Sequence, residues 1–207
     1  MYGGEPSALR TSTITLGATV NDIALTLTAA GVARLLYEAG EATTGRTIRV
    51  SVPVAARPDV RNSGGSPPTM VVLPLDEPDP RLFLDRASAQ TRAAKAARSH
   101  HAPAPLFPTF AVRLMMRWLR RHGSERVSLY TTNVPGPAST LWLDRAPFVN
   151  VWPIAPVSYG LPLAVAVLTY AGTLTMTANA SPDLRHLPAF VTGAEAAMAT
   201  LARQAAS

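Results

Sequence analysis

Four histidines are the residues of this chain best suited to acid–base chemistry: His100, His101, His122 and His186. A neutral imidazole can take the proton of a hydroxyl group at physiological pH, so the adjacent pair His100 and His101 is a candidate general base. Residues 102–105 (Ala-Pro-Ala-Pro) follow the pair directly. Because two prolines break regular structure there, an exposed loop without a catalytic role is the alternative.

The sequence excludes several other kinds of chemistry. The chain has no cysteine, which excludes disulfides, thiol nucleophiles and cysteine metal sites. Ser51, Ser158 and Ser181 lack the glycine-flanked turn of a hydrolase nucleophile. No phosphate-binding loop and no set of ligands at metal-binding spacing occurs. We therefore expect no metal site and no bound cofactor.

Two short segments remain as candidates for a binding site, and the first is the pair Asn21 and Asp22. This pair stands at the start of a predicted helix. Its side chains either cap that helix, as Asn and Asp commonly do, or fix the wall of a substrate channel. Both interpretations remain open at this point.

The second candidate segment is Asn133-Val134-Pro135-Gly136-Pro137, preceded by Thr132. It follows a strand-like run over residues 127–131. Each proline lacks an N–H donor and glycine permits a positive φ, so the pattern predicts that the strand stops and the chain turns. The turn is either a strand terminator with no further role or part of a channel lining.

Capping residues and hydrophobic spacing predict the helices that position these segments. Thr19 and Asp22 form a capping-box pattern before a helix that ends near Gly40. Asp79 and Pro80 are a typical cap and first residue for a helix that reaches about residue 98.

A final helical region and several strands complete the prediction. The helical region follows Ser181, and Pro188 and Gly193 are expected to break its first turns. Runs of β-branched and alternating apolar residues predict the strands, at 47–54, 69–75, 127–132, 147–152, 161–170 and 173–180. Tyr170 to Thr173 is typical of a hairpin turn.

A further helix is predicted over residues 107–121, with an apolar stripe on one side. Its arginines gather on another face: Arg113, Arg117, Arg120 and Arg121. Opposed basic and apolar faces suit a membrane interface, a lipid droplet or an anion. They equally suit an ordinary surface helix packed on a core.

Length and composition indicate one well-packed domain. The chain has 207 residues, of which 47% are hydrophobic and 15% charged. Its net charge of +6 favours anions such as CoA phosphates or an acidic membrane, or merely reflects a GC-rich genome. No basic run interleaves with aromatic residues, so nucleic acid is not an expected partner. Without a long apolar run or a signal peptide, we expect a cytoplasmic protein, with peripheral contact to a membrane or lipid droplet as an option.

The order of the predicted elements indicates the α/β (α+β) class. Helices and strands are mixed without strict alternation, which predicts a mixed sheet with helices mainly on one face. Residues 1–15 are predicted to form an N-terminal arm or linker, and residues 16–207 the domain.

Three segments in this order resemble the C-terminal half of the bacterial wax ester synthase/diacylglycerol acyltransferase family. They are residues 17–23 with the Asn-Asp pair, residues 49–57 with Val52-Pro53-Val54, and residues 132–137. Residues 168–172 resemble the family's late hairpin, and the resemblance covers about residues 15–205. It implies one half of a chloramphenicol acetyltransferase-like fold, in which two similar α/β halves clamp an active-site channel.

The resemblance also implies acyl transfer from acyl-CoA to a lipid hydroxyl, of diacylglycerol or a long-chain alcohol. The family's base is a histidine of a His-His-x-x-x-Asp-Gly motif in the N-terminal half. His100 and His101 lack the Asp and Gly and come after the Asn-Asp pair instead of before it, so we assign no catalytic residue here. The expected partners are an N-terminal half or a second copy, acyl-CoA and a lipid acceptor. The alternative is a non-catalytic binding or interaction module for a hydrophobic ligand or a partner protein.

Overall fold

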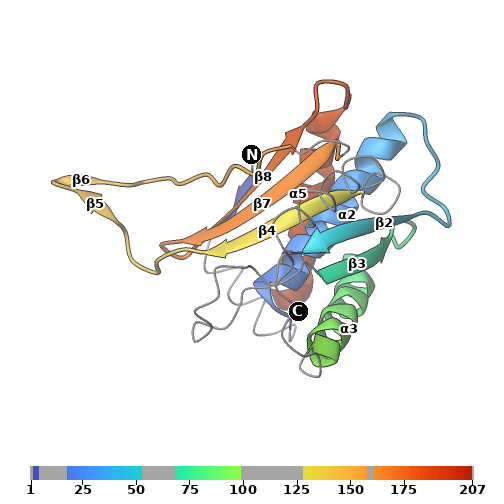
Figure 1. Ribbon diagram of the computed structural model, residues 1–207, viewed down its shortest axis with the longest axis horizontal. Helices are drawn as coiled ribbons and strands as arrows, with labels where there is room; N and C mark the ends of the chain where they lie inside the picture. Colours follow the sequence, from blue (N-terminus) through green and yellow to red (C-terminus); the bar gives the residue numbers. More distant parts are fainter. Residues whose placement is uncertain (1, 5–17, 53–68, 99–127, 158–160, 207) are drawn as a thin grey trace, which may run out of the picture.

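A six-stranded mixed sheet forms the centre of the protein (Figure 1). The computed structural model describes residues 2–4, 18–52, 69–98, 128–157 and 161–206. The strands, in chain order, are β1 (Tyr2–Gly4), β2 (Thr47–Val52), β3 (Thr69–Pro74), β4 (Leu129–Pro135), β7 (Leu163–Tyr170) and β8 (Thr173–Ala180). They lie in the order β1-β8-β7-β4-β2-β3. The neighbours β2–β4 and β4–β7 are parallel and the other pairs are antiparallel, which confirms the predicted mixed sheet.

One face of the sheet carries the helices and the hydrophobic core. The helices are α2 (Val20–Glu38), α3 (Pro80–Arg98) and α5 (Leu187–Ala206). In β2 the alternate residues Ile48, Val50 and Val52 are buried in the same core cluster as residues of all three helices. The alternation predicted for this strand is therefore confirmed over the residues that the structure describes.

The predicted starts of α2 and α3 are confirmed. Thr19 is the N-cap of α2, and Gly40, with φ of +76°, follows the C-cap residue Ala39. Pro80 is the first residue of α3, where its missing N–H belongs to no helical hydrogen bond. None of the described helices is long and apolar enough to span a membrane.

The expectation that Pro188 and Gly193 break the last helix is wrong. Helix α5 is continuous from Leu187 to Ala206. Pro188 stands in the first turn, where proline is tolerated. Gly193 lies where α5 approaches α2, because a Cβ there would be 2.6 Å from the carbonyl oxygen of Ala30. Its role is close helix packing.

The connection between β7 and β8 is the predicted hairpin. Tyr170 pairs with Thr173 across a two-residue turn. Both turn residues have positive φ, +44° at Ala171 and +79° at Gly172. Two successive positive φ values match the twist of the flanking strands, which explains the tight turn.

The strand predicted over residues 147–152 is not formed. The chain between β4 and β7 contains a small hairpin, β5 (Trp142–Leu143) with β6 (Ala146–Pro147), which projects far from the sheet (Figure 1). Residues 148–152 continue without ladder pairing. The β-branched and aromatic residues there have the composition of a strand, but they form no ladder with another described strand.

The first residues of the predicted N-terminal arm lie in the sheet. Tyr2–Gly4 forms the edge strand β1 and pairs with Leu174–Met176 of β8. Residues 5–17 lie outside the described part of the chain, as does the end of the strand predicted to reach Val54. The domain boundary predicted near residue 15 therefore stays a prediction.

Candidate functional site

The carboxylate of Asp22 is buried where the first turn of α2 meets α3. Its Oδ2 accepts hydrogen bonds from the backbone N–H and the hydroxyl of Thr19, both at 2.9 Å. Its Oδ1 accepts a hydrogen bond of 2.6 Å from the hydroxyl of Thr91 on α3. Both carboxylate oxygens are thus engaged, one within α2 and one across the two helices.

Hydrogen bonding keeps this carboxyl group ionised despite its burial. Burial alone would raise the pKa of Asp22, but the bonds from Thr91 and Thr19 outweigh it and hold the pKa below 3.8. Ser88 also faces the carboxylate, but its buried Oγ makes no hydrogen bond within the described residues. A carboxylate with a lowered pKa is a weak base, so Asp22 is poorly suited to accept a substrate proton.

The capping interpretation of the Asn21-Asp22 pair is confirmed at Asp22. Thr19 and Asp22 form a complete capping box, in which the backbone N–H of Asp22 donates to the Thr19 hydroxyl at 3.3 Å. Asn21 is half-buried beside them. The channel-wall interpretation of the pair stays a prediction.

Strand β4 runs through most of the second candidate segment, so the turn predicted after Thr132 is wrong. Pairing with β7 continues to Pro135, opposite Thr169. The N–H of Gly136 donates to the Thr169 carbonyl at 2.8 Å. Because successive residues of a strand point their N–H groups to opposite sides, the two prolines would direct theirs away from β7. On that side the pairing with the described residues of β2 reaches Tyr130, so among the described residues the missing donors interrupt no ladder bond.

Gly136 is needed for space, whereas the sequence pattern indicated only that glycine permits a positive φ. Positive φ among the described glycines occurs at Gly40, Gly45 and Gly172. A Cβ at residue 136 would overlap the Thr169 carbonyl oxygen and lie 3.2 Å from Cδ1 of Leu168. Glycine therefore lets the end of β4 approach the backbone of β7 closely.

Asn133 is the residue of this segment with an unused polar atom. Its Oδ1 is buried and accepts no hydrogen bond within the described part of the chain. It lies on β4 on the same side as Leu129 and Thr131, and Leu129 belongs to the core beneath the helices. A buried acceptor without a donor is costly, so the Asn133 Oδ1 is available to a ligand or a further segment of the chain.

The two candidate segments serve different junctions. Asp22 connects α2 to α3, whereas residues 133–136 pair with β7 at the centre of the sheet. No hydrogen bond between described residues joins them. The sequence missed Thr91, the partner of Asp22, because it lies 69 residues away and carries no motif of its own.

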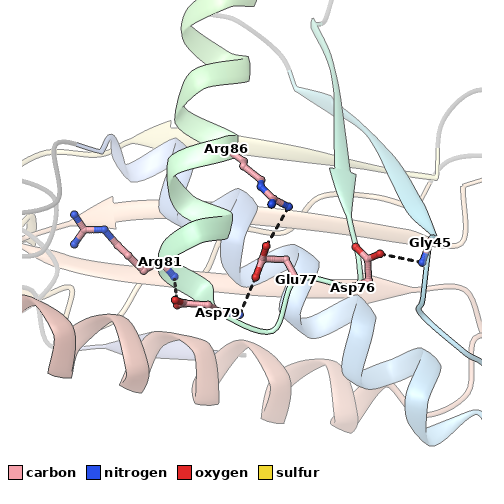
Figure 2. A network of polar contacts seen from close by, with 6 residues as sticks. All are labelled: Gly45, Asp76, Glu77, Asp79, Arg81 and Arg86. Atoms are coloured by element: carbon pink, nitrogen blue, oxygen red, sulfur yellow. Dashed lines mark hydrogen bonds and ion pairs between the residues drawn. The ribbon is translucent and has the colours of Figure 1, made fainter.

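Three acidic residues between β3 and α3 are used for local structure (Figure 2). Asp76 accepts the N–H of Gly45 at 3.0 Å, which ties the turn before β2 to the end of β3. Glu77 pairs with Arg86 at 3.0 Å, and Asp79 accepts the N–H of Arg81 at the start of α3. Within the described residues, no group of three or more His, Asp or Glu side chains is placed to hold a metal ion.

Two hollows on the described surface are unsuited to a long acyl chain. A pocket of about 50 Å³ between α2 and the start of α3 is lined by residues such as Ala30, Leu75 and Phe83. A wide, open hollow of about 410 Å³ is bordered by Arg34, Glu38 and the exposed His186. The first is smaller than a drug-sized ligand needs, and the second is wide open and bordered by the charged side chains of Arg34 and Glu38.

The remaining predicted residues lie outside the described part of the chain. These are the histidines His100, His101 and His122 and the arginines Arg113, Arg117, Arg120 and Arg121. The general-base candidate and the membrane or anion face therefore stay predictions.

The comparison with known families is decisive. A family model, the WS/DGAT C-terminal domain, matches residues 69–202, including the Asn133–Pro137 segment. The chain belongs to the WS/DGAT family. This confirms the resemblance that the three sequence segments indicated.

Named relatives within this family come from mycobacteria. Rv3480c of Mycobacterium tuberculosis H37Rv, named as a diacylglycerol O-acyltransferase, is 32% identical over 168 residues, or 76% of this chain and 34% of that protein. Tgs1 of the same strain, with the same activity in its name, is 29% identical over 75% of this chain and 36% of its own length. This WS/DGAT chain thus spans about a third of the length of these relatives.

Solved structures show the same fold in two kinds of enzyme domain. The wax ester synthase/diacylglycerol acyltransferase from Marinobacter aquaeolei VT8 superposes with a TM-score of 0.79 at 18% identity, over 100% of this chain and 48% of that one. The epimerization domain of tyrocidine synthetase B superposes with a TM-score of 0.58 at 9% identity, over 99% and 47%. The predicted half of a chloramphenicol acetyltransferase-like fold is confirmed.

Proposed function

We propose that this chain is the C-terminal half of an O-acyltransferase that moves an acyl group from acyl-CoA to a lipid hydroxyl. The observation that carries the proposal is the superposition of the whole chain on 48% of the Marinobacter enzyme. The diacylglycerol O-acyltransferase names of Rv3480c and Tgs1 support the same reaction class.

In this reaction a base takes the proton of the acceptor hydroxyl while its oxygen attacks the thioester carbonyl. The carbon–sulfur bond then breaks, and the departing CoA sulfur takes up a proton. The buried carboxylate of Asp22 does not suit the role of base. Its pKa is lowered, and both of its oxygens already accept hydrogen bonds. The proposal therefore places the base in a separate N-terminal half, with diacylglycerol or a long-chain alcohol as acceptor.

The contribution of this chain would be to shape the acyl-CoA and acceptor channel. Asn133 supports this role, because its buried Oδ1 has a free lone pair that can accept a hydrogen bond from an N–H donor such as a pantetheine amide. Peripheral attachment to a membrane or lipid droplet through the arginine-bearing segment 107–121 belongs to the same proposal.

The test compares the chain alone with the chain mixed with the N-terminal part of Rv3480c. Palmitoyl-CoA is the donor, and diacylglycerol or hexadecanol is the acceptor. We expect product in the mixture and none from either part alone. Turnover by the purified chain alone, abolished by His101→Ala, would overturn the proposal. Binding of palmitoyl-CoA without turnover in any mixture would favour the alternative, a non-catalytic module for a hydrophobic ligand.

A further inference from the structure

Strand β3 forms one edge of the sheet, so one side of its backbone faces no other described strand. In the order β1-β8-β7-β4-β2-β3 its neighbour is β2, and the two strands pair over their full length, from Thr69 opposite Val52 to Pro74 opposite Thr47. The outward N–H and C=O groups of an edge strand are a template on which a further strand can pair.

The side chains of β3 give this edge little protection. The strand contains no charged residue, although charges on an edge strand are a common way to keep other strands away. Two of its apolar side chains, Met70 and Val72, are exposed by 43% and 42%. The opposite edge of the described sheet is β1, which has three residues, and so short a strand offers few groups for pairing. Protection of β3 therefore has to come from other elements.

A glutamine of α3 occupies the middle of the β3 edge. Oε1 of Gln90 accepts a hydrogen bond of 3.2 Å from the N–H of Val72. Gln90 is half-buried, and Leu84 and Ala87 of the same helix are buried in the core, so the packed helix fixes where this side chain can reach. Figure 1 shows α3 beside β3. The amide oxygen thus takes the place that the carbonyl of a neighbouring strand would have.

Pro74 closes the next outward position of the strand. Residues 72 and 74 are two apart, so their backbone nitrogens face the same side. Proline has no N–H, and within sheets it is tolerated on an edge strand where that side faces outward. Of the outward positions 70, 72 and 74 of this described strand, Met70 is then the one with an N–H to offer to another strand.

We propose that Gln90 keeps the edge of β3 closed against the β3 strand of a second copy of this chain. The inference goes beyond the proposed function and does not depend on it. In the antiparallel arrangement that opposes Val72 to itself, the two residues would exchange both N–H···O=C bonds, as a closely spaced pair of the ladder does. The N–H that these bonds need is the one that Gln90 engages. Pairing would therefore have to displace the glutamine of each copy.

A second copy is the occupant that this edge fits. A strand that pairs with itself in antiparallel fashion is self-complementary about a twofold axis, which is the commonest symmetry of protein dimers. Because β3 carries no charge, no like charges would lie opposite each other in such a pair. A lipid surface, by contrast, offers no partners to the outward N–H and C=O groups.

The test measures self-association of the whole chain by sedimentation velocity at several concentrations. Gln90→Ala removes the acceptor without adding apolar surface, and alanine is favoured in helices, so α3 should keep its structure. We expect its dimer association constant to exceed that of the wild type about ten-fold, because a hydrogen bond in each copy no longer opposes pairing. Gln204→Ala, at an exposed glutamine of α5, is the matched control and should associate as the wild type does.

Two further variants identify the contact. Gln90→Glu keeps an oxygen that can accept the N–H of Val72, so it should associate as the wild type does. Gln90→Ala/Val72→Lys would place two ammonium groups opposite each other, and like charges directly opposite destabilise a pair. This double variant should return to the association constant of the wild type.

The inference fails if Gln90→Ala associates no more than the wild type does, or if Gln204→Ala or Gln90→Glu associates as strongly as Gln90→Ala. It also fails if adding Val72→Lys leaves the dimer of Gln90→Ala intact, because the contact then lies elsewhere on the chain. None of these outcomes bears on the acyl-transfer reaction, which its own assay tests.

Discussion

The hydroxyl of Thr91 on α3 donates to Oδ1 of Asp22 on α2 at 2.6 Å, across 69 residues of sequence. The acceptor is a buried, charged carboxylate whose other oxygen caps its own helix. One residue thus fixes both the start of α2 and the position of α3. This bond ties the residues 69–202 that match the family model to a helix that precedes them.

Thr91→Val should destabilise the fold through this bond. Valine keeps the shape of threonine but leaves a buried carboxylate oxygen without its donor, so we expect a loss of about 1.5–3 kcal/mol in the free energy of unfolding. Urea denaturation measures it. Thr192→Val is the matched control, because Thr192 is exposed on α5 and its hydroxyl donates only to the Pro188 carbonyl within its own helix. A loss at Thr91 no larger than at Thr192 would contradict the role assigned to the bond.

The lowered pKa of Asp22 predicts a loss of stability in acid. The folded protein binds this proton less readily than the unfolded chain, whose carboxyl group titrates near 3.8. The stabilisation is therefore fully present well above pH 3.8, and it is lost as the pH falls through the lower folded pKa. The difference in unfolding free energy between wild type and Asp22→Asn should shrink between about pH 5 and pH 3. Asp85→Asn, at an exposed carboxylate on α3, is the matched control.

The capping box shows which features of this site the sequence could predict. Thr19 and Asp22 are three residues apart, so the bonds between them depend on local spacing alone. The contact with Thr91 depends on how two helices pack, and no local pattern encodes it. The same limit explains why the sequence did not predict the hydrogen bonds of the Tyr170 hydroxyl to the backbone of Leu141 and Phe148, although the hairpin at Tyr170 was predicted correctly.

The structural effects of Pro135 and Gly136 were predicted incorrectly, because they depend on how β4 pairs with its neighbouring strand. The strand was expected to stop at Thr132, yet its pairing with β7 continues to Pro135, whose missing N–H points away from β7. Gly136 was singled out because glycine permits a positive φ, yet what it supplies is room for the Thr169 carbonyl. In both cases the sequence identified a special position, and only the pairing of strands revealed its cause.

Gly136→Ala should be destabilising although φ at this position needs no glycine. The added Cβ would overlap the Thr169 carbonyl oxygen, and backbone atoms of paired strands cannot move aside cheaply. We expect a loss of about 1–3 kcal/mol in the free energy of unfolding, typical of overpacking. Gly40→Ala provides the comparison, because residue 40 has φ of +76° and open space around it. That variant should lose only about 1 kcal/mol from backbone strain.

Gly193→Ala gives a test in which helix propensity and packing predict opposite signs. Alanine is favoured over glycine by about 1 kcal/mol in a helix interior, so propensity alone predicts a more stable α5. A Cβ at residue 193, however, would lie 2.6 Å from both the Ala30 carbonyl oxygen and Cβ of Arg34 on α2.

Because both contacts involve atoms close to the backbone of α2, the two helices would have to separate. We therefore expect Gly193→Ala to lower the melting temperature, with a net loss of about 1–3 kcal/mol. Ala199→Gly, on the exposed face of the same helix, isolates the propensity term and should cost about 1 kcal/mol. A Gly193→Ala protein more stable than the wild type would mean that α2 and α5 do not approach as closely as Gly193 allows.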